Sequence, residues 1–136
     1  MAHIAKLNKE ANADGTHTVL NVYVVSDNVT ESELSARSGE MYRKTSYNTR
    51  AGTYFTPNTN TIDPDQSKAF RGNFAAKGMV FDPVKDKFYW PAPHPDWTLN
   101  ETEWQFYAPT PHPETLDENG FPDKYIYTDS GWEKVT

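Results

Sequence analysis

The chain has 136 residues and a formal net charge of −6, with no cysteine, 36% hydrophobic residues and 14% aromatic residues. The length is that of a single domain. The aromatic content argues against disorder, because each ring can bury a large apolar area. The negative charge disfavours nucleic acid and anionic membranes as partners. The lack of cysteine excludes disulfides, zinc-thiolate sites and cysteine nucleophiles.

The first part of the chain, residues 1–56, is predicted to form a small α+β body. Residues 3–7 are short and mixed in character, and we interpret them as an edge strand. Residues 18–25 are rich in β-branched side chains and predict a central strand. Thr30 and Glu33 have the spacing of a capping box, which predicts a helix between residues 31 and 44. Residues 46–55 are predicted to form a strand or hairpin interrupted at Ala51-Gly52.

Residues 57–67 are a polar loop by composition, and residues 68–136 are predicted to be a hairpin repeat region. This region holds all four tryptophans and eight of the ten prolines. Three pairs of aromatic residues spaced seven apart enclose polar turns, and proline-rich segments occupy residues 91–95 and 109–113. The pairs are Phe81 with Phe88, Trp97 with Trp104, and Tyr125 with Trp132.

The fold class that follows is mainly β (α+β). We expect a small sheet body with one short helix, followed by a series of proline-linked aromatic β-hairpins. A lone hairpin is marginally stable in water, so the hairpins must pack on the body, on one another or on a partner. The chain is therefore either one compact domain or a body with a docking arm.

The sequence lacks the common motifs of enzyme active sites. There is no Gly-x-Ser-x-Gly, no phosphate-binding loop and no pair of histidines with metal-ligand spacing. His94 and His112 occupy equivalent repeat positions. They could pair on a metal or on an acidic partner, but stacking within proline-rich turns is the favoured interpretation. We therefore expect no enzyme activity, no cofactor and no metal site.

The middle of the chain is locally basic, with aromatic residues between the cations. This pattern fits a platform for single-stranded nucleic acid. It also fits aromatics that face the core while the cations reach outward, and the net charge favours this second reading. The cations are Arg43, Lys44, Arg50, Lys68, Arg71 and Lys77.

Tyr and Trp on rigid hairpins are effective anchors for a partner protein, and their rings can also stack on sugars. We select the aromatic residues of the hairpin region as candidate interaction residues. They are Trp90, Trp97, Trp104, Trp132, Tyr107 and Phe88.

Three stretches of the sequence resemble a family of small proteins encoded by marine tailed bacteriophages, especially phages of cyanobacteria. The stretches are residues 1–7 with 22–25, residues 45–50 with Gly52 and 54–59, and residues 71–82 continuing into the hairpins with Trp97 and Trp104. Residues 30–44 and the expanded segment 114–124 depart from the family pattern.

The resemblance implies a phage origin and no assigned activity. It favours a non-enzymatic virion component, made in the bacterial cytoplasm, that decorates the capsid or belongs to the tail or neck. Its partners would be other virion proteins, such as the major capsid protein, and it would be oligomeric in the particle. The alternative is a host-surface or carbohydrate-binding module that uses exposed Trp or Tyr. An intracellular enzyme or host-takeover factor is the third and least favoured hypothesis.

Overall fold

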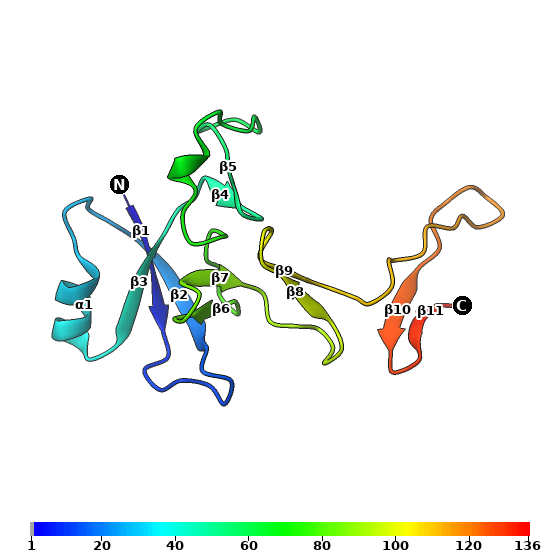
Figure 1. The fold of residues 1–136 in the computed structure, drawn as a ribbon, viewed down its shortest axis with the longest axis horizontal. Coiled ribbons are helices and arrows are strands. Elements are labelled where there is room, and N and C mark those ends of the chain that lie inside the picture. The colour runs from blue at the N-terminus through cyan, green and yellow to red at the C-terminus, as the bar shows by residue number, and fades with distance from the viewer. Residues whose placement is uncertain (1) are drawn as a thin grey trace. The chain divides into compact units, whose positions relative to one another are not determined.

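The computed structural model describes residues 2–136, which form a mainly β structure with one short α-helix (Figure 1). The chain divides into two compact units. The first comprises the residues up to Pro91 together with Asn100–Gln105, and the second comprises Ala92–Leu99 and Phe106–Thr136. No helix in the described chain has the length and apolar character needed to cross a membrane.

The first unit is built on a five-stranded antiparallel sheet with strand order β3-β1-β2-β6-β7. The strands are β1 (Ala2–Leu7), β2 (His17–Val25), β3 (Met41–Thr45), β6 (Val80–Asp82) and β7 (Lys87–Tyr89). The predicted central strand is confirmed, because β2 is the third of the five. The predicted edge strand at residues 3–7 is wrong, because β1 pairs with β2 on one side and with β3 on the other.

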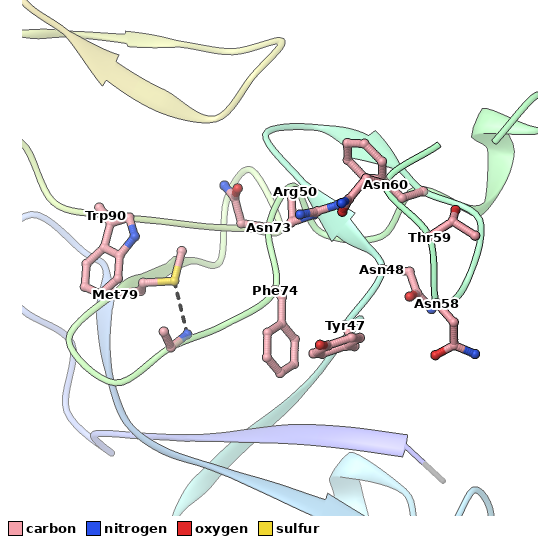
Figure 2. A pocket seen from close by; sticks show the side chains of 12 residues that line it. Tyr47, Asn48, Arg50, Asn58, Thr59, Asn60, Asn73, Phe74, Met79 and Trp90 are labelled. Carbon is pink, nitrogen blue, oxygen red and sulfur yellow. Dashed lines mark hydrogen bonds between the residues drawn. The ribbon is translucent and has the colours of Figure 1, made fainter. Parts of the chain in front are cut away.

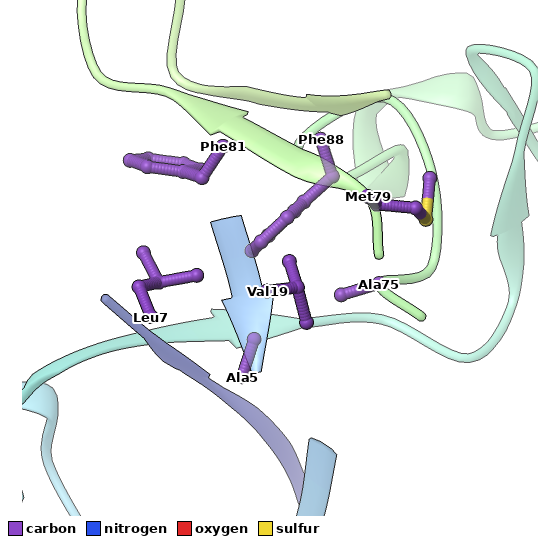
Figure 3. Packing of buried hydrophobic residues seen from close by; sticks show 7 residues of the cluster. All are labelled: Ala5, Leu7, Val19, Ala75, Met79, Phe81 and Phe88. Atoms are coloured by element: carbon purple, nitrogen blue, oxygen red, sulfur yellow. The ribbon is translucent and has the colours of Figure 1, made fainter. Parts of the chain in front are cut away.

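The hydrophobic core is small and lies between β1, β2 and the β6–β7 hairpin (Figure 3). Phe81 and Phe88 lie opposite each other in the ladder, and their ring centroids are 5.0 Å apart. Two fully buried rings supply a large share of the apolar area in a core whose other members are aliphatic residues and one methionine. The clustered residues are Ala5, Leu7, Val19, Ala75, Met79, Phe81 and Phe88.

The helix α1 (Glu31–Ser38) begins with the predicted capping box. Thr30 Oγ1 accepts a hydrogen bond from the backbone N–H of Glu33, and the Glu33 carboxylate accepts one from the backbone N–H of Thr30, both at 3.1 Å. The helix stops at Gly39, whose φ of 74° is left-handed. The predicted helix is therefore confirmed, although the last four residues of its range, 41–44, belong to β3.

A partly buried ion pair joins α1 to the sheet. Arg71 Nη1 donates to Glu31 Oε2 at 2.6 Å and to the carbonyl oxygen of Lys44 at 3.0 Å, and its Nε lies 3.0 Å from an Asp86 oxygen. Burial would raise the pKa of Glu31, but the hydrogen bonds from Arg71 and from the Lys44 backbone N–H outweigh it and lower that pKa. One side chain thus links the helix, β3 and the turn between β6 and β7.

Short two-stranded ladders and loops complete the chain. The turn at Ala51-Gly52 joins β4 to β5, as expected, and the predicted polar loop ends in a short 3₁₀ turn. These elements are β4 (Thr49–Arg50), β5 (Thr53–Tyr54), η1 (Gln66–Lys68), β8 (Thr98–Asn100), β9 (Gln105–Tyr107), β10 (Tyr125–Thr128) and β11 (Gly131–Lys134).

The later hairpins differ from the predicted arrangement of aromatic pairs. Trp104 lies in the turn between β8 and β9 with a left-handed φ of 54°, so it does not flank the turn opposite Trp97. In the last hairpin Trp132 lies opposite Tyr127, while Tyr125 lies opposite Lys134. Of the three aromatic pairs spaced seven residues apart, only Phe81 and Phe88 therefore lie opposite each other across a hairpin.

Candidate functional site

The candidate interaction residues lie in very different environments. Phe88 is fully buried in the core and has no surface to offer a partner, because it faces inward from β7 beside the buried Tyr89. Trp90 and Tyr107 are 54% and 45% exposed. The remaining three tryptophans are partly buried, one in the first unit and two in the second.

Trp104 is held against the body of the first unit. The Asn73 side-chain amide donates to the carbonyl oxygens of Trp104 at 3.0 Å and of Phe88 at 2.9 Å, and its Oδ1 accepts from the backbone N–H of Ala51 at 2.7 Å. The Lys87 ammonium lies 5.4 Å from the Trp104 ring centroid. This ring therefore contributes to folding of the first unit.

Glycines allow the β8–β9 turn to approach this closely. A Cβ built on Gly72 would lie 2.9 Å from the Trp104 ring, and a Cβ on Gly52 would lie 2.0 Å from the carbonyl oxygen of Thr102. Lys85 forms an ion pair with Glu101 beside the same turn. The turn at residues 101–104 is consequently packed within the first unit and is not a free tip.

The centre of the second unit is an aromatic cluster of Trp97, Tyr127 and Trp132. The ring centroids are 5.3 Å apart for Trp97 and Tyr127, 6.0 Å for Trp97 and Trp132, and 5.1 Å for Tyr127 and Trp132. His94 packs 5.1 Å from Tyr127, and His112 packs 4.7 Å from Trp132. Both histidines therefore pack edge to face against aromatic rings and do not stack on them.

Two carboxylates lie within hydrogen-bond distance of His94. His94 Nδ1 lies 2.7 Å from Asp96 Oδ1, and His94 Nε2 lies 2.8 Å from Asp129 Oδ1. The hydrogen bonds to Asp129 and Asp96 raise the pKa of His94. The Tyr127 hydroxyl donates to the other Asp96 oxygen at 2.7 Å. Among residues 2–136, no group of three or more His, Asp or Glu is arranged to hold a metal ion.

The second unit leaves many apolar side chains in solvent. None of its residues, all of which the structure describes, is fully buried, and the cluster rings themselves are partly exposed. The indole N–H of Trp97 is buried without a hydrogen-bond partner among the described residues. The exposed set consists of Tyr107, Leu116, Phe121, Ile126 and Val135, which are 45% to 67% exposed.

The first unit has a pocket of about 530 Å³ between the segments 47–60 and 73–90 (Figure 2). Aromatic and thioether side chains line one part of it, and amides with a single guanidinium line the other. No Asp or Glu is among the lining residues. They are Tyr47, Asn48, Arg50, Phe55, Asn58, Thr59, Asn60, Asn73, Phe74, Ala76, Met79 and Trp90.

Among the residues of this pocket, the sequence predicts only Trp90 as an interaction residue. Arg50 belongs to the basic middle segment, for which the favoured interpretation is cations that reach outward from the core. Asn58 and Asn60 lie in the predicted polar loop. The approach of two loops distant in the chain creates the pocket, and no local pattern records it.

Comparisons of the chain with protein-family models, with curated proteins and with solved structures gave no significant match.

Proposed function

We propose that this chain is a non-enzymatic accessory subunit of a tailed-phage virion, which binds neighbouring virion proteins through its second unit. The observation that carries the proposal is that the second unit has an aromatic cluster, whereas none of its residues is buried as a whole. Exposed apolar side chains of this size are characteristic of surfaces that become covered in an assembly. The phage assignment itself rests on the sequence resemblance.

In this proposal the proline-rich segments 91–95 and 109–113 are stiff spacers between aromatic hairpins. A proline-rich segment, whose φ angles are restricted, loses little conformational entropy when it docks. Trp97 and Trp132 form the floor of the docking surface. Phe121 and Ile126, which are 67% and 54% exposed, are the side chains that a neighbouring subunit covers.

The structural role is tested by mass spectrometry of purified, nuclease-treated particles of the phage that encodes the chain. A copy number comparable to that of the major capsid protein means capsid decoration, whereas a small ring-sized number means a neck or tail position. Absence of the chain from the particles overturns the proposal.

The docking surface is tested separately with the recombinant chain and with particles lacking it. We expect Phe121→Ser and Ile126→Ser to reduce binding to the particles. Val84→Ser is the matched control, because Val84 is 93% exposed in the first unit, outside the proposed surface. Equal binding by all three variants would show that the second unit is not the docking element.

A second candidate function, binding of carbohydrate through exposed aromatic rings, is favoured by the pocket of the first unit. Tyr47 and Trp90 both line it and are 63% and 54% exposed. A sugar ring stacks on such faces while its hydroxyls bond to amides. Titration of the chain with oligosaccharides, followed through the tryptophan fluorescence, tests this candidate.

A further inference from the structure

The pocket of the first unit contains amide groups that the protein leaves unused. The side chains of Asn48, Asn58 and Asn60 make no hydrogen bond to another described residue, whereas Asn73 uses its amide three times to hold backbone groups. An amide offers two N–H donors and one acceptor oxygen. Three unused amides around one cavity therefore offer both donors and acceptors to a ligand.

The single cation of the pocket is also without a carboxylate partner. The Arg50 guanidinium lies 4.1 Å from the centroid of the Phe55 ring, and no described Asp or Glu is within ion-pair distance of it. Stacking on the ring leaves the N–H groups at the edge of the guanidinium available, and their fork matches the two oxygens of a carboxylate. Arg50 and Asn60 both line the pocket (Figure 2).

Aromatic faces form the opposite part of the lining. Tyr47 packs edge to face on Phe74 at 5.3 Å and stacks on His3 at 5.9 Å, so its ring is held in place although it is 63% exposed. Trp90 lies beside Met79 across the pocket (Figure 2). An aromatic ring that is fixed in place and has an exposed face can stack on the apolar side of a flat ligand.

We propose that this pocket binds an acidic saccharide, an inference that rests on the second candidate function and adds its ligand class. The sugar rings stack on Tyr47 and Trp90, the hydroxyls bond to the asparagine amides, and a carboxylate bonds to Arg50. The absence of any carboxylate in the lining distinguishes the pocket from the rest of a chain with net charge −6. A polyphosphate or a nucleic-acid strand would demand more than one cation. The volume of about 530 Å³ lies within the usual range for small-ligand sites.

The proposal is tested by calorimetry of the full chain with trigalacturonic acid and with its neutral counterpart, α-1,4-galactotriose. We expect the acidic trisaccharide to bind about tenfold more tightly, as one charge-assisted pair warrants. Arg50→Gln should abolish this preference while neutral binding persists, and Arg50→Lys should restore only part of it. Arg37→Gln is the control, because it removes an exposed arginine from α1, outside the pocket.

The outcomes separate this inference from the functions proposed above. Equal binding of the two trisaccharides overturns the acidic preference and leaves carbohydrate binding standing. Binding of neither overturns both, while the docking role of the second unit is tested independently. Tighter binding of a thymidine oligonucleotide than of trigalacturonic acid would also overturn the inference. Trp90→Ala should weaken both trisaccharides, and an unchanged affinity would refute the stacking geometry.

Discussion

Replacement of Gly52 by alanine tests whether the β8–β9 turn is packed within the first unit. The new Cβ would lie 2.0 Å from the carbonyl oxygen of Thr102, whereas a carbon and a carbonyl oxygen normally approach to about 3.3 Å. Both atoms are attached to backbone, so a side-chain rotation cannot relieve the clash. The turn must move by about an ångström or more, and the hydrogen bond from Asn73 to Trp104 is then lost.

The magnitude follows from three contributions. A left-handed φ such as the 76° of Gly52 costs an alanine about 1–2 kcal/mol. Overpacking adds about 1–3 kcal/mol, and loss of the Asn73 hydrogen bond about 1 kcal/mol. We therefore expect Gly52→Ala to lower the free energy of unfolding by about 3–6 kcal/mol. Gly15→Ala is the matched control, because Gly15 has a φ of 87° and no atom within 4 Å of the added Cβ.

The assay is urea denaturation followed by tryptophan fluorescence, together with amide hydrogen exchange over residues 98–107. Gly15→Ala introduces a similar backbone strain and the same effect on the unfolded chain. The two variants should therefore differ in their loss of unfolding free energy by about 2–4 kcal/mol, which measures the cost of the close approach to Thr102. Exchange in the turn should accelerate only in the Gly52 variant. A difference below about 0.5 kcal/mol, with unchanged exchange, would refute the packing of this turn.

Three further predictions concern the core and two ion pairs. Phe88→Ala should lower the free energy of unfolding by about 3–5 kcal/mol, measured by urea denaturation, whereas Val84→Ala should change it by less than about 0.5 kcal/mol. The pKa of His94 is raised above its ordinary 6.5 by the hydrogen bonds to Asp129 and Asp96. The stabilisation of the folded state by these bonds is therefore complete below pH 6.5 and is lost as the pH rises through the raised pKa. Denaturation at increasing pH, followed by tryptophan fluorescence, should show this loss, and His94→Gln should remove it. The pKa of Glu31 is lowered below its ordinary 4.5, so the stabilisation from its pair with Arg71 is complete above that pH and is lost as the pH falls through the lowered pKa. In acid titrations followed by circular dichroism, Glu31→Gln should remove this part of the acid sensitivity.

Local chemistry accounts for the elements that the sequence predicted. The β-branched run at residues 18–25 lies within β2, Thr30 and Glu33 form a capping box, and Ala51-Gly52 forms a turn. Each depends on residues close together in the chain. Phe81 and Phe88 also face each other, because the turn that joins their strands is short.

Long-range packing accounts for the features that the sequence did not predict. Residues 3–7 look like an edge strand, but β3 returns to pair with β1 after α1 and covers its outer side. Trp104 resembles a hairpin-arm residue, but contacts with the 71–73 turn place it in a left-handed turn position. The pocket depends on Arg50 and Trp90, which lie far apart in the sequence. Such placements follow from the tertiary contacts and leave no periodic signal.

The second unit also supports a docking role on grounds of size. It contains about forty residues, and chains this short usually need disulfides, metals or association with other chains to be stable. The sequence has no cysteine. The buried N–H of Trp97 has no acceptor among the described residues, and an unpaired buried group costs about 1–3 kcal/mol. The three rings of the unit's aromatic cluster, Trp97, Tyr127 and Trp132, are themselves only partly buried by the unit's own residues. A surface of a neighbouring subunit that covers Phe121 and Ile126 would supply the missing burial, so the unit should gain stability when the protein is assembled.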